Sequence, residues 1–317
     1  MAMHRTLDTG SRKPSLFHAP QFPAIVCVGA ILLICLYSGL AIQRLIASNA
    51  PPFVTFTLGT AYRDVTYCNS QTLDVFIPSV APTRPLPLAI FVHGAGLIGG
   101  AKGYLNPTFL NALATAGVAV ASVNYRLAPH SKWPAQIEDV KCAIRYLRHN
   151  AGTYGINPGE VFAFGTSFGG LLVSLTALTA HQPVFDAGPY LNESSALLAA
   201  VDMFGPADLP GWISDSEIQL VFGGNRAELV TASPVHYITA QAPPILIVQG
   251  TDDTSVPESQ SVEFYDRLVA AGDQTQLIPV HNMGHMWAHV GSQPIDPSLT
   301  QIAAEMVRWF ERYGAGS

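Results

Sequence analysis

The sequence predicts an α/β fold with a mostly parallel central sheet and helices on both faces of that sheet. Short apolar runs of strand length alternate with longer stretches that have helical periodicity. Most of the apolar runs are almost uninterrupted, which is typical of parallel strands that are buried on both faces. The chain has 317 residues, enough for one large domain of this class.

The predicted elements begin with two strands between Val65 and Pro78, "VTYC" and "TLDVFIP", whose alternating pattern indicates a half-exposed antiparallel pair. The buried strands then follow at residues 86–94, 118–125, 161–167, 199–205, 243–250 and 275–280. Helices are predicted at residues 135–150, where apolar residues recur every three or four positions, and at residues 262–271, directly before Gly272.

A separate N-terminal segment precedes these elements. Phe22–Ile42 contains 21 residues without a charge, long enough for a helix to cross about 30 Å of hydrocarbon. We therefore expect a tail at residues 1–21, a transmembrane anchor at 22–42, a linker at 43–60 and the main domain at 61–314. A cleaved signal peptide, which would make the protein secreted, and a buried core helix are the alternatives.

The orientation of the anchor follows from its flanking charges. Arg5, Arg12 and Lys13 precede the apolar segment, whereas Arg44 alone lies close behind it. The tail is therefore expected in the cytoplasm and the main domain on the other side of the membrane.

Charge and cysteine content exclude some functions. The net charge is −6 and no basic run occurs, which argues against a nucleic-acid partner.

The four cysteines divide into two pairs. Cys27 and Cys35 lie in the apolar segment. Cys68 and Cys142 could pair in an oxidising compartment, but Cys142 lies among apolar positions of a predicted helix, which favours buried free thiols. No C-x-x-C or H-E-x-x-H spacing occurs, so neither a metal nor an organic cofactor is expected.

Polar motifs follow the predicted buried strands, at the sheet edge where ligands of such folds bind. They are "HGAG" from His93, "GTSFGG" around Ser167, "TDDTSVP" from Thr251 and "HNMGH" from His281. A serine hydroxyl becomes a good nucleophile when a base and an orienting carboxylate adjoin it. The order serine, aspartate, histidine is that of a nucleophile on a strand-to-helix elbow, although Ser167 alone could be a plain turn residue.

Eight motifs in order resemble the α/β-hydrolase esterases related to hormone-sensitive lipase, in particular their feruloyl-esterase-like and formamidase-like branch. They are "HGAG", "NYRLAP", "WPAQIEDVKCAIRYLRHNAGTYGINP", "GTSFGG", "FGPADL", "SPVHYI", "GTDDTSVP" and "MGH". The resemblance covers about residues 61–314 and implies the α/β-hydrolase fold.

The resemblance also implies a catalytic triad of Ser167, Asp253 and His285, in which His285 takes the proton of Ser167 and Asp253 holds the imidazole. Asp252 remains an alternative acid. His281 and His289 remain alternative bases.

The implied oxyanion hole consists of the backbone N–H groups of Ala95, Gly96 and Phe168. Ala95 and Leu97 depart from the glycine and the aromatic residue usual in this family, and Phe168 replaces the usual alanine. His93 is expected to hold the loop through hydrogen bonds rather than to act in catalysis.

The predicted function is hydrolysis of carboxylic esters with a short-chain or small aromatic acyl group, through an acyl-enzyme and with a small-molecule ester as the partner. Any lid must come from residues 209–229, either as an apolar flap or as a surface loop with a short helix. Phe168 resembles the elbow of prolyl-oligopeptidase-type enzymes, so an amidase or peptidase of the same fold is the enzymatic alternative. A non-catalytic ligand-binding homologue is the other.

Overall fold

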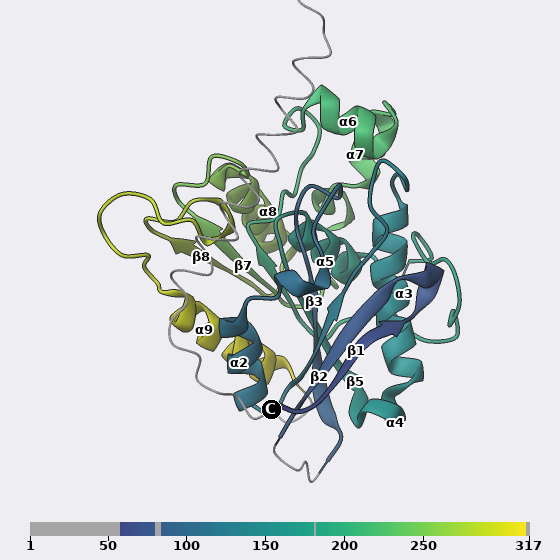
Figure 1. Ribbon diagram of the computed structural model, residues 1–317. Coiled ribbons are helices and arrows are strands. Elements are labelled where there is room, and N and C mark those ends of the chain that lie inside the picture. Colours follow the sequence, from purple (N-terminus) through teal and green to yellow (C-terminus); the bar gives the residue numbers. More distant parts are fainter. Residues whose placement is uncertain (1–57, 80–83, 181, 315–317) are drawn as a thin grey trace, which may run out of the picture. The chain divides into compact units, whose positions relative to one another are not determined.

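The computed structural model describes residues 58–79, 84–180 and 182–314, and these form an eight-stranded sheet with helices around it (Figure 1). The order of the strands across the sheet is β1-β2-β4-β3-β5-β6-β7-β8. The strands are β1 Leu58–Thr66, β2 Thr72–Pro78, β3 Leu86–Val92, β4 Ala119–Val123, β5 Ile156–Thr166, β6 Ala200–Met203, β7 Ile245–Gly250 and β8 Thr275–Val280.

The sheet has one antiparallel edge. β1 pairs antiparallel with β2, and β2 pairs antiparallel with β4, whereas all pairs from β4 to β8 are parallel. The predicted antiparallel pair and the predicted parallel strands are therefore confirmed. β1 begins at Leu58 because its ladder with β2 extends to Pro78, so the end of the predicted linker at residues 43–60 is the start of this strand.

Helices cover both faces of the sheet (Figure 1). α2 and α9 pack together on one face, and α3, α5 and α8 lie on the other. The helices are α2 Pro107–Thr115, α3 Ala135–His149, α4 Ala151–Tyr154, α5 Phe168–Leu178, α6 Asp215–Phe222, α7 Ala227–Thr231, α8 Glu258–Ala271 and α9 Leu299–Tyr313.

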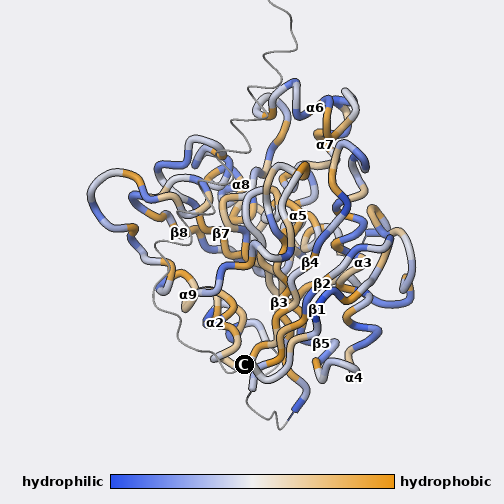
Figure 2. Tube along the Cα trace, viewed as in Figure 1, coloured by the Kyte–Doolittle hydropathy of each residue, from blue (hydrophilic) through white to orange (hydrophobic). Residues whose placement is uncertain are grey.

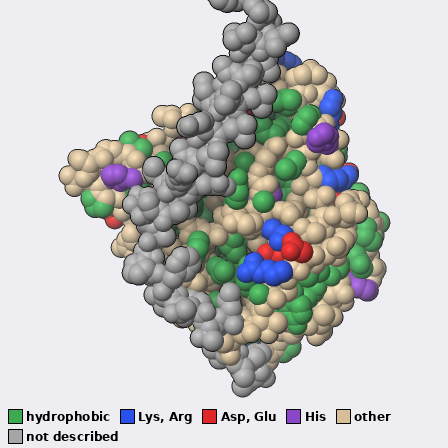
Figure 3. Space-filling view, viewed as in Figure 1, with side chains coloured by type: hydrophobic (Ala, Val, Ile, Leu, Met, Phe, Trp, Pro, Cys, Tyr) green, Lys and Arg blue, Asp and Glu red, His purple; other side chains and the backbone are tan. Residues whose placement is uncertain are grey.

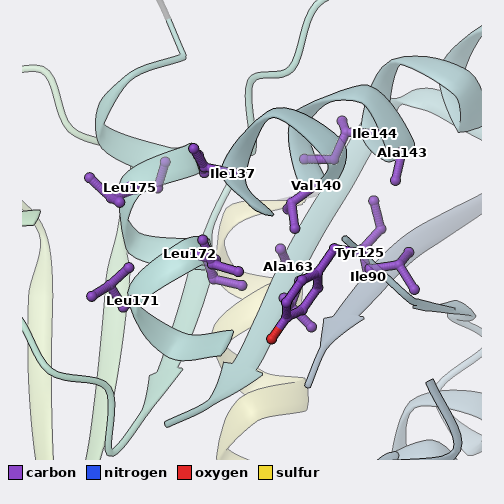
Figure 4. Close-up of a cluster of buried hydrophobic side chains, with 14 of the residues drawn as sticks. Ile90, Tyr125, Ile137, Val140, Ala143, Ile144, Ala163, Leu171, Leu172 and Leu175 are labelled. Carbon is purple, nitrogen blue, oxygen red and sulfur yellow. The ribbon is translucent and has the colours of Figure 1, made fainter. Parts of the chain in front are cut away.

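The core under α3 and α5 fixes the position of the central strands. Ile137, Val140 and Ile144 recur at helical spacing and place one face of α3 against Leu172 of α5 and against Ile90 of β3 (Figure 4). All five side chains are fully buried. Figure 2 shows the corresponding hydrophobic stretches along the central strands. The predicted helices at residues 135–150 and 262–271 are confirmed as α3 and α8.

β8 differs from its prediction. Its sequence "TQLIPV" indicates a buried strand, but β8 is the edge of the sheet and Thr275–Pro279 are half-buried or exposed. An edge strand has a partner on one side and leaves part of its surface to solvent, which the apolar run alone does not reveal.

The expectation of free thiols at Cys68 and Cys142 is wrong, because these cysteines form a disulfide. Both are buried as predicted, but the short 3-10 helix η1 (Cys68–Ser70) packs on α3 and brings their Cα atoms to 6.2 Å. The bond closes a loop across 74 residues, for which chain entropy predicts about 4 kcal/mol of stabilisation.

The predicted transmembrane anchor at Phe22–Ile42 lies outside the described residues, as do Cys27, Cys35, the tail at residues 1–21 and most of the linker. Within the described part of the chain, no helix combines the length and the apolar character that a membrane span requires.

Candidate active site

Ser167 occupies a sharp elbow between β5 and α5. β5 ends at Thr166 and α5 begins at Phe168, and between them Ser167 adopts φ 54° and ψ −130°. Its N–H donates a hydrogen bond of 2.9 Å to the carbonyl oxygen of Met203 in β6. This backbone conformation costs a non-glycine residue about 1–3 kcal/mol, and it presents the side chain at the carboxyl end of the sheet.

The two glycines of G-x-S-x-G allow the close backbone approach that this elbow needs. A Cβ atom on Gly169 would collide with the carbonyl oxygen of Val92 in β3, and a Cβ atom on Gly165 would collide with the backbone of Gly169. The motif therefore has a steric reason: strand, turn and helix pass too close together for any side chain at these positions.

Ser167, His285 and Asp253 come together as the motifs indicate. His285 Nε2 lies 3.0 Å from Ser167 Oγ, and His285 Nδ1 lies 2.7 Å from Asp253 Oδ2. Asp253 Oδ1 accepts hydrogen bonds from the N–H groups of Ser255 and Val256, at 2.8 and 2.9 Å. The Asp253 side chain is fully buried, whereas His285 is 21% exposed and can reach a substrate.

The alternative residues lie elsewhere. Asp252 is exposed and its carboxylate accepts a hydrogen bond from the hydroxyl of Thr251. His281 is exposed, and His289 Nε2 lies 2.6 Å from the carbonyl oxygen of Gln293. None of the three alternatives contacts Ser167.

The loop that follows β3 contains Ala95 and Gly96, two of the expected oxyanion-hole donors, and is called the oxyanion loop below. Ala95 and Gly96 have positive φ angles of 77° and 66°, and none of the described residues accepts a hydrogen bond from their N–H groups. Phe168 is the first residue of α5, where a helical N–H has no acceptor within the helix. Ala95 stands in the left-handed region that favours glycine, which explains why glycine is usual there.

Tyr125 holds this loop in place through hydrogen bonds and ring stacking. Its hydroxyl donates hydrogen bonds to the carbonyl oxygens of His93 and Gly94, at 2.9 and 3.3 Å, and its ring stacks on the His93 ring at 4.2 Å. Burial lowers the pKa of His93 to about 4, so the imidazole is neutral at pH 7. His93 thus holds the loop, in line with its expected role.

The segment after β4 provides more anchors for the same loop. The N–H of Ala128 donates to the carbonyl oxygen of Leu97, and Asn124 Oδ1 accepts from the N–H of Lys102. Arg126 Nε in turn lies 2.8 Å from the carboxylate of Asp139 in α3. The sequence prediction missed the supporting role of Asn124 and Tyr125, although both lie in or beside the motif "NYRLAP".

A second buried carboxyl group, Asp202 of β6, lies behind the elbow. It accepts hydrogen bonds from Ser174 Oγ at 2.6 Å and from the N–H of Gly205 at 2.8 Å, and a Cβ atom on Gly170 would collide with it. Burial raises the pKa of Asp202 to about 6. The signal for this residue is a single charge inside the apolar run "AAVDMFG".

Residues 209–229, from which any lid was expected to come, contain α6 and the start of α7, and these two short helices lie side by side as a cap (Figure 1). The N–H of Trp133 bonds the carbonyl oxygen of Val221 in α6 and ties this cap to the chain before α3. Beneath it, Phe168 is 3% exposed and its ring centroid lies 6.2 Å from that of Trp212.

Within the described residues, no group of three His, Cys, Asp or Glu side chains is placed to hold a metal ion. The strand order, the strand-to-helix elbow and the geometry of Ser167, His285 and Asp253 are those of the α/β-hydrolase fold. The BD-FAE family model matches residues 73–268, and the chain belongs to this family. This confirms the resemblance to the feruloyl-esterase-like α/β-hydrolases that the sequence motifs indicate.

Curated relatives carry names that agree with this class. Esterase LipC of Mycobacterium tuberculosis is 29% identical over 246 residues, which are 74% of this chain and 61% of LipC. Esterase LipQ of the same organism is 32% identical over 240 residues, which are 71% of this chain and 56% of LipQ. The chain thus spans little more than half the length of these relatives.

Solved structures share the fold. A truncated carbohydrate esterase from gut microbiota superposes with a TM-score of 0.73 at 28% identity and covers 84% of this chain and 99% of its own. Esterase 2 of Thermogutta terrifontis superposes with a TM-score of 0.67 at 23% identity and covers 84% of this chain and 100% of its own. The second likeness concerns the fold alone.

Tyr125→Phe should lower kcat for an ester substrate about tenfold and change KM by less than about twofold, because it removes the hydroxyl that fixes two carbonyl groups of the oxyanion loop but keeps the stacked ring. Steady-state kinetics measure both constants. Tyr154→Phe is the matched control, since the hydroxyl of this buried tyrosine contacts that of Tyr146 instead. A kcat for Tyr125→Phe equal to that of the unmodified protein would contradict the supporting role.

Asp202→Asn should change how stability depends on pH. The folded protein keeps the Asp202 proton up to about pH 6, whereas the unfolded chain loses it near the ordinary pKa of 3.8. The unmodified protein therefore loses stability as pH rises from about 4 to 6, by up to about 3 kcal/mol, and the variant should lack this loss. Urea unfolding at pH 4 and pH 7 measures it; parallel pH profiles would exclude the buried, protonated carboxyl.

Proposed function

We propose that the protein is a serine hydrolase that cleaves carboxylic esters through an acyl-enzyme, with Ser167 as nucleophile, His285 as base and Asp253 as the orienting acid. The observation that carries this proposal is the continuous pair of contacts from Asp253 through His285 to Ser167 Oγ, at 2.7 and 3.0 Å. The names of the relatives support the same reaction class.

In the first step, Ser167 Oγ attacks the ester carbonyl carbon while His285 Nε2 accepts the hydroxyl proton. Asp253 stabilises the resulting imidazolium through its contact with Nδ1. The tetrahedral intermediate then collapses, the bond to the alcohol oxygen breaks, and His285 returns the proton to that oxygen. Water then enters, and His285 Nε2 takes a proton from it as the water oxygen attacks the acyl carbon. The bond between that carbon and Ser167 Oγ breaks, His285 returns the proton to Oγ, and the acid leaves.

The charge that develops on the carbonyl oxygen needs donors already in place. The N–H groups of Ala95, Gly96 and Phe168 are assigned this role, and in known cases one such donor contributes about 3–4 kcal/mol. Their arrangement depends on the backbone and not on the side chains, so the departures at Ala95 and Phe168 leave the donors available.

We assign short acyl groups to the acid side of the site. The support for this assignment is that Phe168, the residue after Ser167, is almost fully buried and that its ring packs against Trp212. We assign a small acyl group such as acetyl to the place beside this aromatic pair. The short helices α6 and α7 are too small to line a groove for a long acyl chain.

We further propose that the catalytic domain lies outside the cytoplasm and is held by the apolar segment Phe22–Ile42. The positive charges before this segment support that orientation. The Cys68–Cys142 disulfide supports it independently, because structural disulfides persist in oxidising compartments.

The function is tested with nitrophenyl esters of two to ten acyl carbons, comparing the full chain with Ser167→Ala. We expect the highest kcat/KM on the shortest esters and a fall of several orders of magnitude in the variant. Ser174→Ala, which changes a buried serine of α5 away from His285, should retain activity. If the folded protein leaves esters intact but cleaves anilides, it is an amidase; inactivity on both would favour a ligand-binding protein.

The location is tested by adding protease to intact cells. The catalytic domain should be degraded while a cytoplasmic marker protein survives, and thiol alkylation under denaturing, non-reducing conditions should leave Cys68 and Cys142 unmodified. Full protection of the domain would exclude the proposed orientation. Secretion of a shortened chain would instead indicate signal cleavage.

A further inference from the structure

We infer that the substrate is an ester of an apolar alcohol, because exposed hydrophobic side chains flank the leaving-group side of Ser167. This inference rests on the proposed function and adds to it the chemical class of the alcohol. The acid side and the alcohol side are separate spaces, so a closed acyl pocket and an open alcohol site are compatible.

The reaction itself locates the alcohol. His285 Nε2 must come within hydrogen-bond reach of the leaving oxygen in order to protonate it. The carbonyl oxygen of the same ester points toward the N–H groups of Ala95 and Gly96. The first atoms of the alcohol therefore lie between the His285 loop and the oxyanion loop, and the side chains beside these groups determine what it meets.

Those neighbouring side chains are Ile98 and Met286. Ile98 is 46% exposed, and its Cγ1 lies 3.6 Å from the place a Cβ of Gly96 would occupy, so this side chain borders the oxyanion loop. Met286 directly follows His285 and is 38% exposed. Both apolar groups thus adjoin the two parts of the site between which the alcohol must pass.

The backbone around Met286 explains its exposure. Met286 and the next residue, Trp287, both have positive φ angles, 54° and 64°. Trp287 packs inward, with its ring 4.9 Å from Phe204 and 5.2 Å from Phe109. Phe204 also lies 5.1 Å from the His285 ring. The inward tryptophan fixes the turn, and Met286 remains at the surface.

The apolar character extends outward along the same two segments. Tyr104 is 48% exposed, with its ring 6.3 Å from that of His93, and Val290 is 38% exposed on the His285 loop. Of the nine exposed large hydrophobic side chains in the described part of the chain, four belong to residues 93–104 and 281–290. These segments are a small part of the molecule, so the exposed apolar residues are concentrated there.

The same segments offer few polar groups to a sugar. Residues 281–290 contain no Asp, Glu, Lys or Arg, and in residues 93–104 Lys102 is the one charged side chain. Its side chain is 15% exposed, and its ammonium group already contacts Asp64 and Asp74, at 2.9 and 2.5 Å. On the side of the molecule drawn in Figure 3, a central group of Lys, Arg, Asp and Glu side chains lies among hydrophobic and uncharged polar residues. Recognition of a sugar needs several convergent hydrogen-bonding groups. Of the polar side chains in residues 281–290 other than His285, Asn282 and His289 already bond the carbonyl oxygens of Pro294 and Gln293, and His281 is exposed.

The experiment compares three acetates with the full chain: methyl acetate, hexyl acetate and an acetylated methyl xyloside. The acyl group is the same in all three, so differences in kcat/KM report on the alcohol. We expect hexyl acetate to exceed the sugar acetate at least about tenfold. Ile98→Ser and Met286→Ser should each lower the ratio of hexyl to methyl acetate about fivefold, because apolar contact area is lost.

Leu191→Ser is the matched control, because Leu191 is 61% exposed in a segment remote from His285 in sequence and should leave the ratio unchanged. The ratio is internal to each preparation, so partial misfolding of a variant does not disturb it. A sugar acetate cleaved as well as hexyl acetate, or ratios unaffected by both variants, would overturn the inference. Failure on all three acetates would instead contradict the esterase proposal, and the inference would fall with it.

Discussion

The backbone elbow at Ser167 is the constraint on which the rest of the site depends. Gly169 lies so close to the carbonyl group of Val92 that the start of α5 and the end of β3 are fixed against each other without intervening side chains. The oxyanion loop begins directly after β3, so the nucleophile and the expected oxyanion donors share one rigid support. The large buried core under α3 and α5 offsets the local strain of about 1–3 kcal/mol.

The two histidines near Ser167 show how environment divides one residue type between two roles. His93 is buried against Tyr125, and burial lowers its pKa so far that it stays neutral. His285 is partly exposed, and its Nδ1 lies 2.7 Å from the carboxylate of Asp253, which fixes the orientation of its ring. A base must gain and release a proton, so the second environment suits the reaction, whereas a permanently neutral ring suits the support of a loop.

The sequence predicted the features that local pattern determines. Uninterrupted apolar runs located the parallel strands, and the resemblance to a known family singled out Ser167, Asp253 and His285. The disulfide depends on the packing of η1 on α3, which no local pattern reveals. Tyr125 and Asp202 are polar groups satisfied by distant backbone atoms, so their roles require the tertiary structure as well. The exposed edge of β8 follows from strand order and not from composition.

The polar groups around the oxyanion loop are turned toward the protein interior. The Tyr125 hydroxyl, the Asn124 side chain and the Lys102 ammonium group are all bonded to parts of the loop or its support. The loop is therefore held by the groups that could otherwise have faced a substrate, and its outer surface is left to Ile98 and Tyr104. A rigid oxyanion hole and an apolar entrance are thus two results of the same arrangement. An alcohol at this entrance is selected by its apolar area rather than by hydrogen bonds, and the ester carbonyl, which the N–H groups bind, supplies the polar recognition.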